Sequence, residues 1–144
     1  MAYERRGGDG GRGRPIALVR RWYEDVLTRR HADVIDEIVA AGYRDDTHAP
    51  PREGPAGARQ EVGALFATFA AMRFTIDDMI AEGDTVVTIW TGDLTPARPR
   101  SPSPGTAVTV AGISIYRIMD GQFVEKRSAD DLLDVRDQID PDLL

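Results

Sequence analysis

The stretch from Thr106 to Asp131, TAVTVAGISIYRIMDGQFVEKRSADD, carries the strongest indication of the fold. Two runs in it, Ala107 to Ile118 and Gln122 to Ser128, have the residue types of β-strands. The segment Met119-Asp120-Gly121 between them contains an Asp-Gly pair, which is favoured in tight hairpin turns. We therefore predict an antiparallel hairpin whose second strand runs into two adjacent carboxylates.

These carboxylates, Asp130 and Asp131, are the first candidates for chemistry. An acid at the end of a sheet strand can line a cavity, and a carboxyl group in an apolar cavity can act as acid or base near neutral pH. Because strand side chains alternate, we expect at most one of the two to face inward. In an alternative interpretation, both acids precede a terminal helix over Leu132 to Ile139, where they cap N–H groups and complement the helix dipole.

Composition limits the class of protein. The chain has 144 residues, which suits one domain with one core. Its formal net charge of -6 argues against a nucleic-acid partner. The absence of cysteine excludes disulfides, thiolate metal sites and a cysteine nucleophile. No apolar run approaches the ~20 residues that a membrane span needs, and the N-terminus lacks an apolar signal-peptide core. We therefore expect a cytoplasmic protein that is not bound to a membrane.

The first half of the chain predicts helices. We expect residues 1–14, rich in Gly and Arg, to be a disordered tail, and residues 15–144 to form a single domain. Pro15 suits the first turn of a helix whose apolar residues recur at helical spacing up to Leu27. A second helix is predicted between a capping Asp33 and a terminating Gly42. A third is predicted over Ala58 to Met72.

The second half predicts strands. We predict two strands, Met72 to Met79 and Thr85 to Thr95, joined by a turn at Glu82-Gly83-Asp84. The hairpin follows them. Helices on one face of an antiparallel sheet define an α+β layer fold. We predict a cone in which three N-terminal helices pack against a strongly curved, mainly antiparallel sheet that encloses one pocket.

Four segments resemble the SnoaL-like polyketide cyclases, within the superfamily of nuclear-transport-factor-like and ketosteroid-isomerase-like α+β cones. The segments are Arg20 to Ala40, Gly54 to Gln60, Phe74 to Thr91 and Val108 to Asp131. The resemblance covers nearly everything from Ile16 onward. It implies a cofactor-independent enzyme that binds a small hydrophobic, polyketide-like substrate, and a homodimer packed through the outer sheet face.

The chain departs from the family pattern at three places. Family members often carry Asp-His after the second helix, whereas Asp46 occupies the His position here and His48 follows two residues later. A Gly-Thr-His segment of the family is replaced by Gly92 to Thr95. Lys126-Arg127 stands where the last strand commonly has His-Trp. We therefore expect a reshaped and more charged pocket.

The resemblance also suggests catalytic residues. Asp131 aligns best with the acid that these cyclases use as general acid/base, with Asp130 one residue out of register. Asp46 or His48 would be its partner, since two titratable groups across one pocket can give and take a proton. Alternatively, Asp46 is a turn-forming carboxylate and His48 an exposed turn residue.

Aromatic residues are the candidates for substrate binding. Collectively they could form a wall that stacks on a polycyclic or polyene ligand, although for any one of them plain core packing is the favoured interpretation. The set is Tyr23, Tyr43, Phe66, Trp90 and Tyr116. Two distant histidines have no ligand spacing, so we expect no metal, and the chain has neither a phosphate loop nor a dinucleotide fingerprint, so we expect no cofactor.

The resulting functional hypothesis is a cyclase of natural-product biosynthesis, antibiotic biosynthesis included. Plausible reactions are intramolecular aldol closure and closure of an oxygen heterocycle by hydroxyl attack on an epoxide or enone. Each needs a proton removed at one end of the substrate and delivered at the other. The alternatives are an isomerase, dehydratase or epoxide hydrolase on the same fold, and a non-catalytic ligand-binding module.

Overall fold

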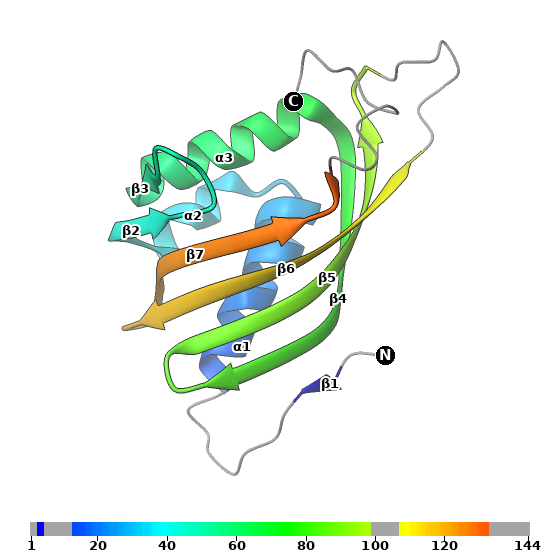
Figure 1. Ribbon diagram of the computed structural model, residues 1–144. Helices are drawn as coiled ribbons and strands as arrows, with labels where there is room; N and C mark the ends of the chain where they lie inside the picture. Colours follow the sequence, from blue (N-terminus) through cyan, green and yellow to red (C-terminus); the bar gives the residue numbers. More distant parts are fainter. Residues whose placement is uncertain (1–2, 5–12, 99–106, 133–144) are drawn as a thin grey trace.

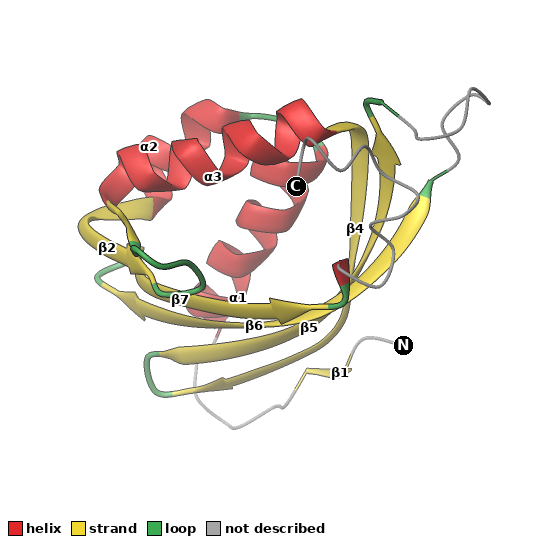
Figure 2. Ribbon diagram, turned by 45° about the horizontal axis from the view of Figure 1, so that its top comes forward, coloured by secondary structure: helices red, strands yellow, loops and turns green. Residues whose placement is uncertain are grey.

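The computed structural model describes residues 3–4, 13–98 and 107–132 and has an α+β architecture (Figure 1). The strands form one sheet in the order β1-β4-β5-β6-β7-β2-β3. Neighbouring strands from β4 to β7 are antiparallel, whereas β2 pairs with β7 in parallel. Figure 2 shows the long strands curving and the helices on the concave side. The predicted fold class, three helices packed on a curved and mainly antiparallel sheet, is confirmed.

The helical layer comes mainly from the first half of the chain. Helix α1 (Gly13–Arg21) has Pro15 in its first turn, as expected, and continues into a π-helical segment, η2 (Trp22–Thr28). A short 3-10 turn, η3 (Ala32–Val34), leads into α2 (Ile35–Ile38). The longest helix is α3 (Gly54–Thr68). Within the described residues, no helix has the length and apolar character to cross a membrane.

The strands alternate between a buried and an outward face. The elements are β1 (Tyr3–Glu4), β2 (Val39–Asp45), β3 (Arg52–Glu53), β4 (Phe69–Glu82), β5 (Thr85–Pro96), β6 (Val108–Met119) and β7 (Gln122–Asp130). Alternate residues of β5 and β6 are buried against the helices, as a period of two requires. Their inner side chains, together with those of α1, η2 and α3, form the core.

The predicted hairpin is present. Met119 pairs with Gln122, so β6 and β7 are joined by a two-residue turn. Both turn residues have positive φ, 53° at Asp120 and 74° at Gly121, as a type I′ turn needs. The Asp-Gly pair is suited to this turn because both residues adopt left-handed backbone conformations at low cost.

Two predicted helix ends are wrong. The second helix ends at Ile38, and Gly42 lies inside strand β2 rather than terminating a helix. The third helix starts at Gly54 and ends at Thr68, four residues before the predicted end at Met72. In both places the segment that follows pairs with another strand, β2 with β7 and β4 with β5. Tertiary pairing therefore outweighs the local helical pattern.

Two expectations fall largely on residues that are not described. Of the predicted terminal helix, residues 133–139 lie outside the described residues. Of the predicted disordered tail, only Tyr3–Glu4 in β1 and the first two residues of α1 are described. The division into a tail and one domain therefore stays a prediction.

Candidate functional site

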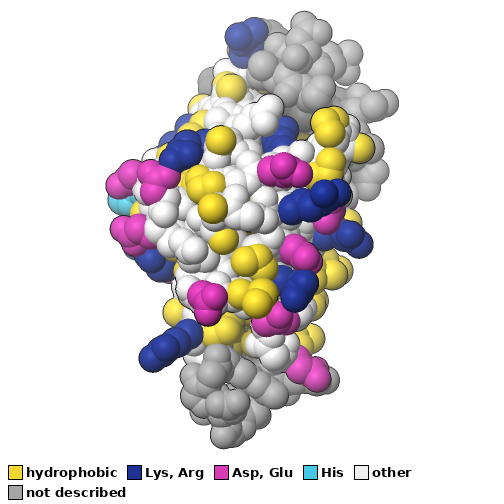
Figure 3. Space-filling model, turned by 90° about the vertical axis from the view of Figure 1, so that its left-hand side faces the viewer, with side chains coloured by type: hydrophobic (Ala, Val, Ile, Leu, Met, Phe, Trp, Pro, Cys, Tyr) yellow, Lys and Arg dark blue, Asp and Glu magenta, His cyan; other side chains and the backbone are white. Residues whose placement is uncertain are grey.

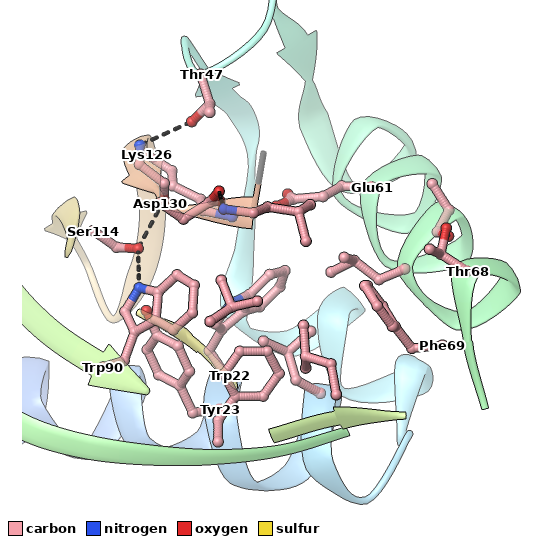
Figure 4. A pocket seen from close by; sticks show the side chains of 18 of the residues that line it. Trp22, Tyr23, Thr47, Glu61, Thr68, Phe69, Trp90, Ser114, Lys126 and Asp130 are labelled. Atoms are coloured by element: carbon pink, nitrogen blue, oxygen red, sulfur yellow. Dashed lines mark hydrogen bonds and ion pairs between the residues drawn. The ribbon is translucent and has the colours of Figure 1, made fainter. Parts of the chain in front are cut away.

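A cavity of about 290 Å³ is lined by residues of the helices and of the concave face of the sheet. Segment η2 and helix α3 contribute one side of its lining, and inner residues of β4 to β7 contribute the other (Figure 4). Twelve of the lining residues are apolar or aromatic and nine are polar or charged, and such a combination is found in small-molecule sites. The cavity is therefore the candidate functional site.

An aromatic wall forms one side of the cavity. The ring centroids of Tyr23 and Phe74 are 5.7 Å apart, and those of Phe74 and Trp90 are 5.4 Å apart. Tyr116 meets Tyr23 edge-on at 6.3 Å. These separations are those of favourable aromatic pairs. The planes of Tyr23 and Phe74 are inclined by 56° and those of Phe74 and Trp90 by 68°, so the rings hold one another in place and give the cavity an aromatic lining.

Trp90 occupies its position because the residue opposite it has no side chain. Trp90 pairs across the strands with Gly112, and a Cβ at Gly112 would lie 2.1 Å from Trp90 Cζ2. The indole Nε1 donates a hydrogen bond of 3.0 Å to Ser114 Oγ. Ser114 Oγ in turn lies 2.7 Å from Ser128 Oγ. A chain of polar groups therefore runs along the inner face of β5, β6 and β7 (Figure 4).

The two buried tyrosines stay protonated. Their hydroxyl oxygens are 2.7 Å apart. Burial raises the pKa of Tyr23 well above its ordinary value, and the neighbouring Tyr116 adds to this. Burial likewise raises the pKa of Tyr116. Both residues therefore act as neutral hydrogen-bond donors and acceptors, not as nucleophiles or bases.

Three buried charged side chains meet at the edge of the cavity. Lys126 of β7 donates a hydrogen bond to Glu61 Oε1 of α3, and its Nζ lies 4.0 Å from Asp45 Oδ2 of β2. Burial on its own lowers the pKa of Lys126, but the carboxylates of Glu61 and Asp45 outweigh it, so this pKa lies above its ordinary value. Burial likewise raises the pKa of Asp45 on its own, but Lys126 and the hydrogen bonds from Thr47 bring it below its ordinary value. Lys126 and Asp45 are therefore both charged at neutral pH.

Of the two adjacent acids, Asp130 lines the cavity and Asp131 is not among the lining residues. Asp130 pairs with Gly112 across the hairpin, and both belong to the inward-facing set of their strands. Asp131 Oδ1 accepts a hydrogen bond of 2.8 Å from the backbone N–H of Ala111. Asp130 Oδ1 accepts one of 3.0 Å from the N–H of Leu132. The side chain of Asp130 is exposed, so it lies at the mouth of the cavity.

The two residues of the second predicted pair, Asp46 and His48, also lie in different surroundings. His48 lines the cavity and is exposed, so it too lies at the mouth. Asp46 is not among the lining residues, and its carboxylate pairs with Arg44 at 2.6 Å and with Arg127 at 3.8 Å. The structure thus brings Asp130 and His48 to one cavity and directs Asp46 and Asp131 elsewhere.

Three of the five predicted substrate-binding residues, Tyr23, Trp90 and Tyr116, line the cavity. Tyr43 and Phe66 are not among the lining residues. Tyr43 is buried in the core, whereas Phe66 lies under the guanidinium of Arg30, whose Cζ is 4.6 Å from the ring centroid.

Glu61 is a site residue that the sequence reasoning misses. It is one residue from Val62 and four from Leu65 in α3, so it falls on the face that packs inward. A charged residue at helical spacing within an apolar stripe is a signal that could have revealed it. Lys126 stands out in the sequence as a departure from the family pattern, but its partner lies 65 residues away.

The described residues contain no group of three or more His, Asp or Glu side chains that could hold a metal ion.

On the side of the molecule drawn in Figure 3, acidic and basic side chains are interspersed, with hydrophobic side chains between them. Among the exposed charged side chains, Arg117 of β6 forms ion pairs with both Asp84 and Glu125 at 3.1 Å.

Comparison with protein families matches residues 19–126 to the SnoaL-like domain. No curated protein sequence matches the chain.

Solved structures show the same fold. A protein from Jannaschia sp. CCS1, named a SnoaL-like polyketide cyclase, is 24% identical, with a TM-score of 0.80 over 94% of this chain and 97% of its own. TsrD from Streptomyces laurentii is also 24% identical, with a TM-score of 0.75 over 88% of this chain and 95% of its own. IdmH from Streptomyces antibioticus, named a polyketide cyclase, is 20% identical, with a TM-score of 0.72 over 83% of this chain and 93% of its own. At these identities the likeness is one of fold.

Proposed function

The chain belongs to the SnoaL-like domain family, and we propose that it is a cofactor-independent cyclase that closes a ring in a hydrophobic, polyketide-like natural product. The observation that supports this most directly is an apolar, aromatic-walled cavity with Asp130 and His48 at its mouth. Such a cavity can hold a flexible chain in a folded conformer, which raises the rate by proximity. The two titratable groups supply the proton transfers that ring closure needs.

In this proposal Asp130 is the general base and His48 the general acid. For an aldol closure, the Asp130 carboxylate removes a proton from the carbon next to a carbonyl group. The resulting enolate carbon attacks a second carbonyl of the same molecule and forms the new carbon–carbon bond. His48 in its protonated form then delivers a proton to the alkoxide. No electron acceptor is required, because the reaction rearranges bonds within one molecule.

The same proton transfers would serve an oxygen-ring closure, an isomerisation or a dehydration. Each of these reactions includes removal of a proton, either from a carbon next to a carbonyl group or from a hydroxyl group. A binding protein, in contrast, would use the aromatic wall without any proton transfer. The base is therefore the feature to test.

The test uses a bicyclic ketone, 2-tetralone, in deuterated water. Exchange of the protons next to its carbonyl group is followed by proton NMR. We expect the protein to accelerate exchange and Asp130→Asn to reduce that acceleration by roughly 10² to 10⁴. Asp131→Asn is the matched control, because it removes the same charge one residue away while its Oδ1 can still accept the hydrogen bond from Ala111.

The outcome separates an enzyme from a binding protein. Equal exchange rates in the wild type and Asp130→Asn, at equal melting temperatures, would refute the assignment of the base. Bound ketone without accelerated exchange would favour a ligand-binding module instead.

We also propose that two copies of the chain pack through the outer face of the sheet. That face carries exposed large hydrophobic side chains: Ile89, Ile113, Ile115 and Met119. They come from β5 and β6 and point away from the helices. Covering such a surface with the same surface of a second copy would remove apolar area from water.

A further inference from the structure

Asp45, Glu61 and Lys126 form a cluster of buried charges at the edge of the cavity, and the presence of this cluster needs an explanation. Removing charged groups from water is costly, and a buried ion pair is often no more stabilising than apolar residues of the same volume. Here three charges come from three separate elements, β2, α3 and β7. Side-chain exposure is 0% for Asp45, 11% for Glu61 and 8% for Lys126. Glu61 and Lys126 line the cavity (Figure 4), whereas Asp45 is not among the lining residues.

The cluster has unused hydrogen-bonding capacity. An ammonium group has three donors. Lys126 uses one of them on Glu61 Oε1, and its 4.0 Å separation from Asp45 Oδ2 is too long for a hydrogen bond. On the acceptor side, Glu61 Oε2 is buried and has no hydrogen-bond partner. Asp45 Oδ2 is likewise buried without a partner. Because Glu61 and Lys126 both line the cavity, a ligand at this wall would meet a donor residue and an acceptor residue side by side.

The charge of the cluster limits what can bind there. Two carboxylates face one ammonium, so the formal charge is -1. A ligand carboxylate placed between Lys126 and Glu61 would lie against another carboxylate and lose its hydration, even though Arg52 also lines the cavity. A ligand ammonium would lie against Lys126 itself. A neutral hydroxyl group satisfies both partners, because it accepts a hydrogen bond from Lys126 and donates one to Glu61.

We propose that Glu61 and Lys126 form a subsite for a neutral hydroxyl group of an aromatic or otherwise planar ligand. The ring would pack against the aromatic wall of Tyr23, Phe74 and Trp90, and the hydroxyl group would supply the missing partners of the ion pair. The subsite rests on the proposed function in one respect only, because both take the cavity as the place where the substrate binds. It names the substrate class as hydroxylated and uncharged at that end.

The experiment compares three probes of similar shape, 2-naphthol, naphthalene and 2-naphthoate, by isothermal titration calorimetry at neutral pH. A hydrogen bond to a charged group favours 2-naphthol over naphthalene by about tenfold or more. 2-Naphthoate is expected to bind more weakly than 2-naphthol. Equal affinity for 2-naphthol and naphthalene, including no binding of either, overturns the subsite, as does tighter binding of 2-naphthoate.

Two matched variants distinguish a direct contact between the ligand hydroxyl group and Glu61 from a general effect of removing one negative charge. Glu61→Gln and Asp45→Asn each remove one negative charge, but only Glu61 lines the cavity. Both should strengthen binding of 2-naphthoate, while only Glu61→Gln should reduce the preference for 2-naphthol over naphthalene. An equal loss of that preference in both variants would overturn the contact. Near-UV circular dichroism verifies folding, and the wild-type comparison needs neither variant.

Binding and turnover are read independently. A preference for 2-naphthol with no Asp130-dependent proton exchange would refute the proposed function and support the subsite. Asp130-dependent exchange without the preference would support the function and overturn the subsite.

Discussion

Replacing Gly112 with alanine tests whether the cavity wall has the packing described. The added Cβ would lie 2.1, 2.5 and 2.7 Å from Cζ2, Cε2 and Cη2 of Trp90. These separations are far inside van der Waals contact, and the obstructing atoms belong to a rigid ring that is itself buried. The indole must therefore move, and its hydrogen bond to Ser114 at 3.0 Å must lengthen or break.

The expected cost follows from these two effects. Overpacking a core typically costs about 1–3 kcal/mol, and a lost hydrogen bond adds about 1 kcal/mol. The sum for Gly112→Ala is roughly 2–4 kcal/mol, which for a domain of this size lowers the melting temperature by about 10 °C. Thermal unfolding followed by far-UV circular dichroism measures it. Because Trp90 lines the cavity, affinity for an aromatic probe should fall as well.

Controls make this prediction specific. Gly63 lies on the exposed side of α3, and a Cβ added there would have no neighbouring atom within 4 Å. Gly63→Ala should therefore raise stability by roughly 0.5–1 kcal/mol. In the Gly112→Ala background, Trp90→Phe should restore part of the loss, because a smaller ring leaves room for the methyl group. An unchanged melting temperature in Gly112→Ala would refute the packing argument.

Three further predictions concern charge, hydrogen bonding and assembly. The pKa of Asp45 lies below its ordinary value of 3.8 and that of Lys126 above its ordinary value of 10.5. Both side chains should therefore contribute their full stabilisation at pH values between these two. The contribution of Asp45 should be lost as the pH falls through its folded pKa, and that of Lys126 as the pH rises through its folded pKa. Urea unfolding of the wild type and of Asp45→Asn at a series of pH values measures this. Tyr23→Phe removes the 2.7 Å hydrogen bond to Tyr116 and should lower the free energy of unfolding by about 1 kcal/mol in urea titrations; no loss would mean that the hydroxyl pair is not stabilising. Ile113→Lys on the outer sheet face should shift a dimer to monomer in analytical ultracentrifugation, and an unaffected dimer would place the interface elsewhere.

The local pattern of residues is sufficient for much of the fold. The Asp-Gly pair predicts the β6–β7 turn because only a few residue types adopt positive φ at both turn positions. Helical spacing predicts α1 because its apolar residues fall on one face within a few turns. Such signals involve residues close together in the sequence, so they need no knowledge of the rest of the chain.

The structure brings some of the candidate site residues to one cavity and leaves others outside it. Three of the five aromatic candidates line the cavity, and so do one acid of the Asp130-Asp131 pair and His48. The choice between the two acids depends on the register of β7 against β6, where a shift between Arg117 and Ile118 sets which residues face inward. A shift of one residue reverses the face of every side chain that follows.

The sequence by itself determined the three helices and the four long strands that form β4 to β7, the hairpin turn and the residue types available for acid–base chemistry. Only the tertiary structure decided that Thr68 ends α3, that Asp130 and not Asp131 lines the cavity, and that Glu61 meets Lys126. The physical reason is that strand pairing, strand register and the burial of charges are settled by partners distant in sequence. Local preferences of about 1 kcal/mol or less per residue are outweighed by those contacts.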